Sequence, residues 1–410
     1  MKSFKQLVEA KTTKNVHMTH IEDRVLYGGV TGAREAIFAL RGLRDMLAGN
    51  ISGRTNVTVK WDGAPAVFAG IDPNDGQFFV AKKGIFNKDP KVYKSYEDID
   101  RDTSGDLSTK LKIAFDELKN IGIRGVVQGD LMFTKKDLQT TVINGIRYVT
   151  FQPNTIVYAV PFASALGRRI RRANLGIVFH TSYSGSDFEK MKASYNVNVG
   201  SFKQKKSVWF DNANVKDLTG TANFTSIQTN EVTAAISTAG KIFQQISGST
   251  LRDLESNPDL AGLIETFNNS IVRKGERIVN TGSHVGELIN WFKERYAKEL
   301  GKRSSERGRE AVLQRREETL SFFSTENRKN LVLMFDLMNA IVDAKLIIIR
   351  KLDELKRMKT FVLTKNGFKV TGQEGFVAIN DSGGAVKLVD RLEFSYNNFS
   401  PDTIKGWQRW

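Results

Sequence analysis

The chain of 410 residues contains no cysteine and only four histidines. The lack of cysteine excludes disulfides, thiolate zinc sites and cysteine nucleophiles, and it suits the reducing environment of a cytoplasm. With so few histidines, metal chemistry based on imidazole ligands is not expected. No run of about 18 apolar residues occurs, and the N-terminus has no apolar signal-peptide core. We therefore expect a cytoplasmic protein that does not span a membrane.

What the chain does have is an excess of positive charge. Lys and Arg total 61 against 45 Asp and Glu, which gives a formal net charge of +16. Such an excess attracts polyanions, of which nucleic acid is the first candidate and an anionic membrane surface the second. The alternative is a soluble basic protein without a polyanionic partner, because net charge bears on association and not on fold.

The pattern of apolar residues divides the chain into strand-rich and helix-rich parts. After an initial loop, Thr31 is expected to cap a first helix. Strand-like segments follow from residue 57 to about 185, interrupted by an amphipathic helix over 107–120. Residues 227–358 are helical almost throughout, and strand character then returns. This order predicts a β-rich module that is split in sequence by an inserted helical module.

Two runs of charge lie outside the strands. The run R-R-I-R-R at 168–172 interrupts strand-like sequence, so we expect it on an exposed loop, where it suits contact with phosphate. The charge-rich run at 302–318 is typical of a solvated helix face, and a surface that contacts nucleic acid is the alternative.

The residues Lys60-Trp61-Asp62-Gly63 lie at the end of an expected strand and match the pattern K-x-D-G. A match of four residues is weak by itself, and the plain alternative is a strand end followed by a turn. Four further short elements follow in order on expected strands: Gln128-Gly129-Asp130-Leu131, Leu175 to His180, Glu374-Gly375-Phe376-Val377 and Ala385-Val386-Lys387-Leu388.

This ordered set resembles the covalent nucleotidyltransferase superfamily, which includes ATP-dependent DNA and RNA ligases and mRNA capping enzymes. The resemblance implies an α+β fold with a ligase-type nucleotidyltransferase domain of antiparallel sheets and flanking helices, here with a large helical insertion. On this view residues 1–225 form the first part of the nucleotidyltransferase domain, 226–359 the helical inserted module and 360–410 the last strands of the domain.

The resemblance implies that Lys60 is the nucleophile that takes AMP from ATP and forms a lysyl–AMP intermediate. A free lysine has a pKa of about 10.4 and is protonated at pH 7, so an amine nucleophile needs nearby positive charge that favours its neutral form. Mg²⁺ or Lys387 would supply this charge, and Lys387 would also hold the oxygens of the α-phosphate.

The remaining positions are implied to bind nucleotide and metal. Asp62 and Gly63 would let the chain turn at the strand end, and Asp62 would also accept hydrogen bonds from substrate hydroxyls. Asp130 and Glu374 carry hard oxygen ligands that fit ribose recognition and Mg²⁺ (or Mn²⁺) binding. Phe179 would stack on adenine, with an ordinary core aromatic as an equal alternative.

Some positions depart from the superfamily pattern. Pro65 stands where ligases commonly carry an arginine, and Val389 stands where a second lysine is usual. Phosphate contacts are then expected from Lys82 and Lys83, in a basic turn after a strand, although a solvated turn is equally open. Asp130 is one methylene shorter than the glutamate of the family.

The order of the modules bears on the substrate. DNA ligases and capping enzymes carry an OB barrel after the last lysine-bearing strand, and the roughly twenty residues after that strand are too few to build one. RNA ligases often pair the catalytic domain with helices, so RNA is favoured over DNA. The elements H-x-E-D at 20–23, K-W-D-G-A-P at 60–65 and P-N-T-I at 153–156 resemble an uncharacterised group of phage proteins. This second resemblance implies a viral origin and a place in the host cytoplasm.

The leading hypothesis is an ATP-dependent polynucleotide ligase, expected to be a monomer, that joins 5′-phosphate and 3′-hydroxyl ends of RNA or DNA. Two alternatives stay open. One is a non-catalytic nucleic-acid-binding protein on a ligase-like scaffold, suggested by the missing arginine and second lysine. The other is a GTP-using capping guanylyltransferase, which the missing barrel disfavours.

Overall fold

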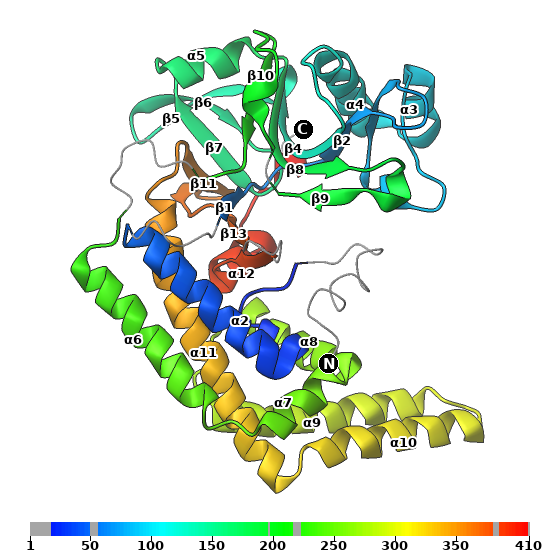
Figure 1. The fold of residues 1–410 in the computed structure, drawn as a ribbon, viewed down its shortest axis with the longest axis vertical. Coiled ribbons are helices and arrows are strands. Elements are labelled where there is room, and N and C mark those ends of the chain that lie inside the picture. Colours follow the sequence, from blue (N-terminus) through cyan, green and yellow to red (C-terminus); the bar gives the residue numbers. More distant parts are fainter. Residues whose placement is uncertain (1–17, 50–55, 196, 216–222, 380–384, 409–410) are drawn as a thin grey trace.

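The computed structural model describes residues 18–49, 56–195, 197–215, 223–379 and 385–408. It is a mixed α+β structure in which three β-sheets lie at one end and most of the helices at the other (Figure 1). Among the described strands, neighbours in the sheets are antiparallel except β8 and β10. None of the described helices combines the length and the apolar character that crossing a membrane requires.

Two larger sheets form the upper part of the molecule. One has the order β10 (Val208–Asn212), β8 (Leu175–Ser184), β4 (Val126–Thr134), β2 (Ala66–Ile71) and β3 (Phe78–Ala81), with β9 (Lys192–Ser194) paired to β8. The other has the order β12 (Gly367–Val370), β11 (Lys359–Thr364), β7 (Ile156–Pro161), β6 (Ile146–Phe151) and β5 (Gln139–Ile143). Helices α3 (Tyr96–Asp102), α4 (Gly105–Leu118) and α5 (Ala165–Arg172) pack beside them.

The lower part is a helical layer. It contains α2 (Arg24–Leu47), α6 (Ser226–Phe243), α7 (Gly248–Glu255), α8 (Pro258–Arg273), α9 (Thr281–Gly301), α10 (Glu306–Phe322) and α11 (Thr325–Asp353). The short helix α12 (Arg391–Phe399) contacts α8. The expected long helix is therefore present as α11, which ends where the chain returns to the sheets.

Helix α2 lies with the inserted helices although it precedes them by 178 residues in the chain. Its apolar residues, including Ile37 and Leu40, are buried in the same core as residues of α6 and α11. The helical layer is thus built from two separate stretches of the chain, whereas residues 1–225 were all expected to belong to the nucleotidyltransferase domain. The helix begins at Arg24, before the expected cap at Thr31, and Gly29, which is not helical and has a φ of 50°, divides it into two segments. A Cβ at Gly29 would lie 2.7 Å from the Leu251 carbonyl oxygen, so this conformation needs glycine.

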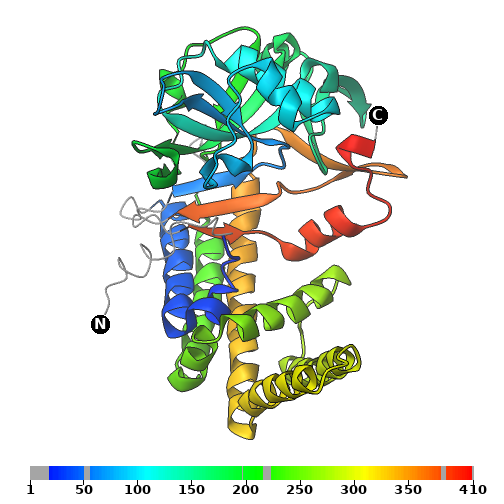
Figure 2. The same cartoon turned by 90° about the vertical axis from the view of Figure 1, so that its right-hand side faces the viewer.

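A third, small sheet joins the two parts. Its strands are β1 (Asn56–Lys60), β13 (Gly375–Ile379) and β14 (Ala385–Leu388), in that order. Figure 2 shows this sheet between the helices below and the larger sheets above. The last strands of the chain are therefore divided, because β11 and β12 join β7 whereas β13 and β14 join β1.

The two faces of the β1–β13–β14 sheet differ in character. One face packs into the core of the helical layer and consists of Val57, Val59, Phe376, Ala378, Val386 and Leu388. Successive residues of a strand alternate between faces, so Lys60, Val377 and Lys387 belong to the opposite face. This alternation places both expected catalytic lysines on the side of the sheet that the helices do not cover.

Candidate active site

Lys60 is the last residue of β1, and it pairs with Gly375 at the start of β13. Glu374 comes just before this glycine, and Lys60 Nζ donates a hydrogen bond to Glu374 Oε1 within an ion pair. The side chain of Lys60 is 30% exposed and that of Glu374 is 10% exposed. Burial raises the pKa of Glu374 to about 7 although the charge of Lys60 opposes this shift. An accessible amine thus lies beside a carboxylate that can take up a proton near neutral pH.

Lys387 lies on β14 opposite Val377, two residues along β13 from the glycine that pairs with Lys60. Burial, followed by the positive charge of Lys60, lowers the pKa of Lys387, while the charge of Glu374 opposes the change. The two lysines therefore repel each other across one carboxylate. A bound anion between them would relieve this repulsion, and the α-phosphate of a nucleotide has the required charge.

Asp130 comes from a different sheet and reaches the same site. It lies on β4, and its carboxyl is affected by the charges of Lys60, Glu374 and Asp62. Loss of surrounding water raises its pKa to about 7, opposed by Lys60 and reinforced by the two acids. Gly63 makes this approach possible, because a Cβ at that position would lie 2.5 Å from Asp130 Cβ. The glycine of K-W-D-G is required here by close packing of the chain against β4.

The Asp62 carboxylate accepts hydrogen bonds from other residues of the chain. Its Oδ1 accepts a hydrogen bond from Asn154 Nδ2 at 2.7 Å, and its Oδ2 accepts one from each backbone N–H of Thr155 and Ile156, both at 2.6 Å. Only 5% of the residue is exposed. Burial raises its pKa, and these three hydrogen bonds oppose the shift. Asp62 therefore ties the turn after Lys60 to the start of β7, which differs from the expected contact with a substrate hydroxyl.

Phe179 is a core residue in the structure. Its ring is fully buried and packs edge-to-face on Phe202, with the ring centroids 5.5 Å apart. A ring with no exposed face leaves no room for adenine to stack on it in this structure, and the burial fits the alternative of a core aromatic. The strand nevertheless contributes to the site through the next residue along the chain.

His180 was missed by the motif comparison. Phe179 and Thr181 oppose Gly129 and Gln128 on β4, so His180 is the extra residue of a β-bulge. Bulges turn a side chain away from the regular alternation of a strand, and they are common beside active sites. His180 Nε2 lies 3.8 Å from Asp130 Oδ2. Burial, followed by the charge of Lys60, lowers its pKa to about 4, so the ring is neutral at pH 7.

His20 is a second residue whose position beside the site is evident only from the structure. The backbone of residues 19–21 pairs with β14, because Lys387 N–H donates to the Thr19 carbonyl and Ile21 N–H donates to the Lys387 carbonyl, at 3.0 and 3.2 Å. This parallel bridge puts His20 beside Lys387 on the same face of the sheet. The His20 Nδ1 atom is buried without a hydrogen-bond partner among the described residues. Burial lowers the pKa of His20 to about 3.

Lys82 and Lys83, from which phosphate contacts were expected, directly follow β3 at the edge of one larger sheet. Lys82 Nζ lies 2.9 Å from Asp102 Oδ2, and this aspartate also binds Lys91. Lys83 is exposed at the start of a short 3₁₀ turn over Lys83–Phe86. The alternative of a solvated basic turn fits this placement. A basic group that lies beside Lys60 is Lys387.

Metal binding was expected at Asp130 and Glu374. Across the described residues, no group of three or more His, Asp or Glu side chains has the arrangement of a metal site. Two carboxylates are sufficient for Mg²⁺ when the remaining ligands are water and substrate phosphate, which is the usual arrangement for this ion. Asp130 and Glu374, which interact through their charges, form such a pair.

A comparison with family models gives one match, a family of unknown function (DUF6267), over residues 15–403. The chain belongs to this family. No curated protein and no solved structure matches the chain.

In this member of DUF6267 the three short elements H-x-E-D, K-W-D-G-A-P and P-N-T-I meet around Lys60. Asp62 of the second element binds the third, as described above, and His20 of the first adjoins Lys387. The two acids of H-x-E-D form buried ion pairs: Glu22 Oε1 lies 2.8 Å from Lys345 Nζ in α11, and Asp23 lies 3.0 Å from Arg391 at the start of α12. These pairs attach the segment of His20 to the helical layer.

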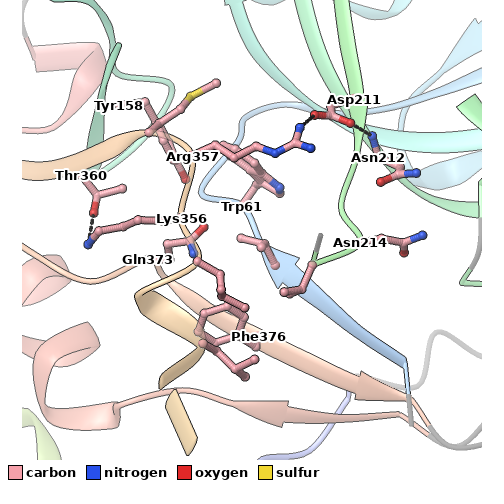
Figure 3. Close-up of a pocket in the computed structure, with 15 residues that line it drawn as sticks. Trp61, Tyr158, Asp211, Asn212, Asn214, Lys356, Arg357, Thr360, Gln373 and Phe376 are labelled. Carbon is pink, nitrogen blue, oxygen red and sulfur yellow. Dashed lines mark hydrogen bonds and ion pairs between the residues drawn. The ribbon is translucent and has the colours of Figure 1, made fainter. Parts of the chain in front are cut away.

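Two hollows lie beside the site. The one in Figure 3 has a cavity volume of only about 30 Å³ and is lined by Val59, Trp61 and Phe376 among others, so it belongs to the face of β1 opposite Lys60. Arg357 closes one side of it with an ion pair to Asp211 at 2.6 Å. A second hollow, with a cavity volume of about 250 Å³, is lined by Glu374 and by polar residues of α11 and α12. It reaches the carboxylate partner of Lys60 from the side of the helices.

Proposed function

We propose that the protein is a covalent nucleotidyltransferase that acts as an ATP-dependent polynucleotide ligase, with Lys60 as its nucleophile. The observation that supports this most directly is the meeting of Lys60, Asp130, Glu374 and Lys387 in one site. These residues come from two sheets and are up to 327 positions apart in the chain. Four elements chosen only for their order in the sequence would not be expected to meet by chance.

The proposed first step is adenylylation of Lys60. Glu374 takes a proton from the Lys60 ammonium, and the neutral amine attacks the α-phosphorus of ATP. The new P–N bond replaces the P–O bond to the β-phosphate, the nitrogen loses its second proton to the departing pyrophosphate, and pyrophosphate leaves. Lys387 stabilises the negative charge on the α-phosphate oxygens as the transition state forms. A base with a pKa of about 7 is well matched to this task at neutral pH.

The later steps transfer AMP and seal the strand. The 5′-phosphate of a nucleic acid attacks the phosphorus of lysyl–AMP, which releases the Lys60 amine and forms a 5′–5′ pyrophosphate link. A 3′-hydroxyl then attacks the 5′-phosphorus, a phosphodiester bond forms, and AMP leaves. In these later steps, once Glu374 has released its proton, Mg²⁺ would be held by Asp130 and Glu374 together with substrate phosphates and would neutralise charge that develops on the phosphate oxygens.

The fold is compatible with this proposal. Antiparallel sheets with flanking helices are the arrangement that the resemblance implies, and β1, β4, β8, β13 and β14 carry the matching elements in the required order. The large helical layer favours RNA over DNA as the substrate, on the analogy with RNA ligases that pair a catalytic domain with helices.

Incubation with ATP labelled at the α-phosphate and with Mg²⁺ should give labelled protein. The label should be stable in alkali and labile in acid, as a phosphoramidate is. Lys60→Ala should abolish it, whereas Lys302→Ala, which removes an exposed lysine at the end of α9 in the helical layer, should leave it unchanged. A Lys60→Ala protein that labels as well as the original would contradict the proposal. Stronger labelling from GTP than from ATP would indicate a capping guanylyltransferase instead.

A second candidate function is nucleic-acid binding without catalysis. Two observations favour it: Asp62 is occupied by hydrogen bonds within the chain, and Phe179 is buried in the core. Salt-sensitive binding of RNA or DNA, with no labelled protein at any concentration of Mg²⁺ or Mn²⁺, would establish this function. Sealing of a nicked RNA or DNA duplex would exclude it.

A further inference from the structure

The run R-R-I-R-R lies on helix α5 and not on the expected loop. Ile170, in the middle of the run, is fully buried under the helix. With 3.6 residues per turn, Arg168 and Arg172 are therefore on the outer side of α5, about one turn apart, and both are exposed. No large apolar side chain of α5 is exposed. The helix presents guanidinium groups to the solvent and keeps its apolar residue for the core.

The other arginines of the run are held in place at the two flanks of α5. On one flank, Arg171 and Arg147 of β6 both stack on the ring of Phe162, with guanidinium carbons 3.8 and 4.0 Å from the ring centroid. On the other flank, Arg169 donates a hydrogen bond to Gln204 Oε1 at 2.5 Å. Cation–π contacts and hydrogen bonds of this kind hold guanidinium groups without neutralising them. The charge therefore remains available to a partner.

Charge is concentrated in this part of the chain. Residues 138–210 contain ten Lys and Arg but only two acidic residues, Asp187 and Glu189, so they carry half of the formal net charge of +16. Within the part of the chain that the structure describes, none of the five arginines in this segment lies within 4.0 Å of a carboxylate oxygen. By contrast, α10 carries four Arg and four Glu, and Arg315 pairs with Glu299 at 2.6 Å.

We propose that α5, together with Arg147, binds the sugar–phosphate backbone of a nucleic acid whose end is held at Lys60; this inference rests on the function proposed above. Strand β7 connects the two places, because Asp62 binds its first residue and α5 begins four residues after its last. Six residues at about 3.3 Å each separate them by roughly 20 Å. Phosphates of one strand follow every ~3.4 Å, so the basic helix meets the duplex about six base pairs from the reacting end.

A lipid surface is the other polyanion that arginines attract, and the helix does not suit it. A helix that lies on a membrane buries an apolar face in the lipid, whereas Ile170 of α5 is buried in the protein and Leu166 packs against the same core. Arginine is also the residue best matched to phosphate, because its planar group donates two parallel hydrogen bonds. The chemistry of α5 thus fits a row of phosphates at fixed spacing.

The test is the salt dependence of binding to a labelled nicked duplex, made with RNA in one series and DNA in another. The double variant Arg168→Gln/Arg172→Gln should bind more weakly, and the slope of log K against log salt should become less negative by about 2, close to ~0.9 for each lost phosphate contact. Arg307→Gln/Arg309→Gln removes the same charge from exposed positions of α10 and is the matched control. Labelling of Lys60 by ATP without nucleic acid should be unchanged in both variants.

Shortening the duplex tests the position of the surface. Cutting one arm of the nicked duplex below about six base pairs should weaken binding to the original protein as much as the double variant does, with no further loss in the variant. An unchanged salt slope in the α5 variant, or an equal change in the α10 control, would overturn the proposal. An α5 variant that loses binding to phosphatidylserine vesicles but keeps duplex binding would also overturn it. If α5 binds nucleic acid but Lys60 is never labelled, the surface stands and the ligase proposal fails.

Discussion

The two faces of the β1–β13–β14 sheet share the same strands and backbone, but one face is apolar and the other carries two lysines. On one face Val59, Phe376 and Leu388 continue the apolar core of the helical layer. On the other face, Lys60 and Lys387 repel each other next to Glu374, and burial raises the pKa of this glutamate. A sheet of three short strands can hold such a costly arrangement because its other face anchors it in a large core. Because successive residues of a strand point to opposite faces, the side chains that stabilise the fold and those proposed for the chemistry are neighbours in the sequence.

Loss of an aromatic ring from the helical face should have the largest effect on stability. Phe376→Ala removes a side chain that is 1% exposed, and burial of this kind contributes about 3–5 kcal/mol of unfolding free energy. Chemical denaturation followed by circular dichroism measures the change, and Phe376→Leu should lose much less. A Phe376→Ala protein as stable as the original would show that the helical layer does not support the sheet.

Loss of charge from the other face should act on the chemistry. Lys387→Met keeps most of the apolar stem and removes a half-buried charge, so the free energy of unfolding should stay the same or rise slightly. The rate of Lys60 adenylylation should fall by about 10²–10³, as when a group that stabilises transition-state charge is removed. Single-turnover labelling with ATP measures the rate. Equal rates in the two proteins would remove Lys387 from the site.

The pH dependence should have opposite signs for activity and stability. In the proposed mechanism Glu374 must be ionised to take the proton of Lys60, so labelling should rise about tenfold per pH unit and level off above an apparent pKa near 7. The same raised pKa means that the folded protein binds this proton more tightly than the unfolded chain, so stability should fall as pH rises from about 4.5 to 7.

Glu374→Gln separates these two effects. The variant should label slowly at every pH, and it should lose part of the decrease in stability between pH 4.5 and 7. Asp130 also has a pKa of about 7 and interacts with Glu374, so the two carboxyls titrate as a pair. If the activity profile near pH 7 survives unchanged in Glu374→Gln, Asp130 is the group that controls it.

The smallest expected effect on the rate concerns two histidines, one beside the candidate site and one inside the helical layer. His20 adjoins Lys387, whereas His284 lies inside the helical layer, where its Nε2 is 2.8 Å from Asn268 Oδ1. His20→Ala should slow adenylylation by up to about tenfold, the worth of one hydrogen bond to substrate, and should hardly change stability. His284→Ala should lower stability and leave the rate per folded molecule unchanged. The reverse pattern would show that His20 serves only the fold.

The local sequence pattern predicted helices and strands well, but it did not predict which of them pack together. The spacing of apolar residues predicted the long helix that is now α11, because a helix of 29 residues keeps its period over many turns. It could not show that α2 packs with α6 and α11, since contacts between distant segments leave no mark on either one. It also misplaced the start of α2, because the bend at Gly29 interrupts the period.

The site shows the same limit at the level of single residues. Motif order identified Lys60, Asp130, Glu374 and Lys387, which the structure brings together. It assigned Phe179 to the site instead of His180, because a bulge in β8 shifts the alternation by one residue and no sequence pattern marks the bulge. It gave Asp62 to a substrate, whereas three donors from residues 154–156 occupy that carboxylate.

By itself the sequence determined which groups this protein can use: amines, carboxylates and a large excess of positive charge, with no thiol and little imidazole. It also determined the period of each helix and strand, since both are local properties. Only the tertiary structure decided which face of β1 carries Lys60 into the site, which acid is its partner and that the arginines of α5 form a helix. These depend on packing between segments hundreds of residues apart, where burial changes the pKa of a group and chooses its neighbours.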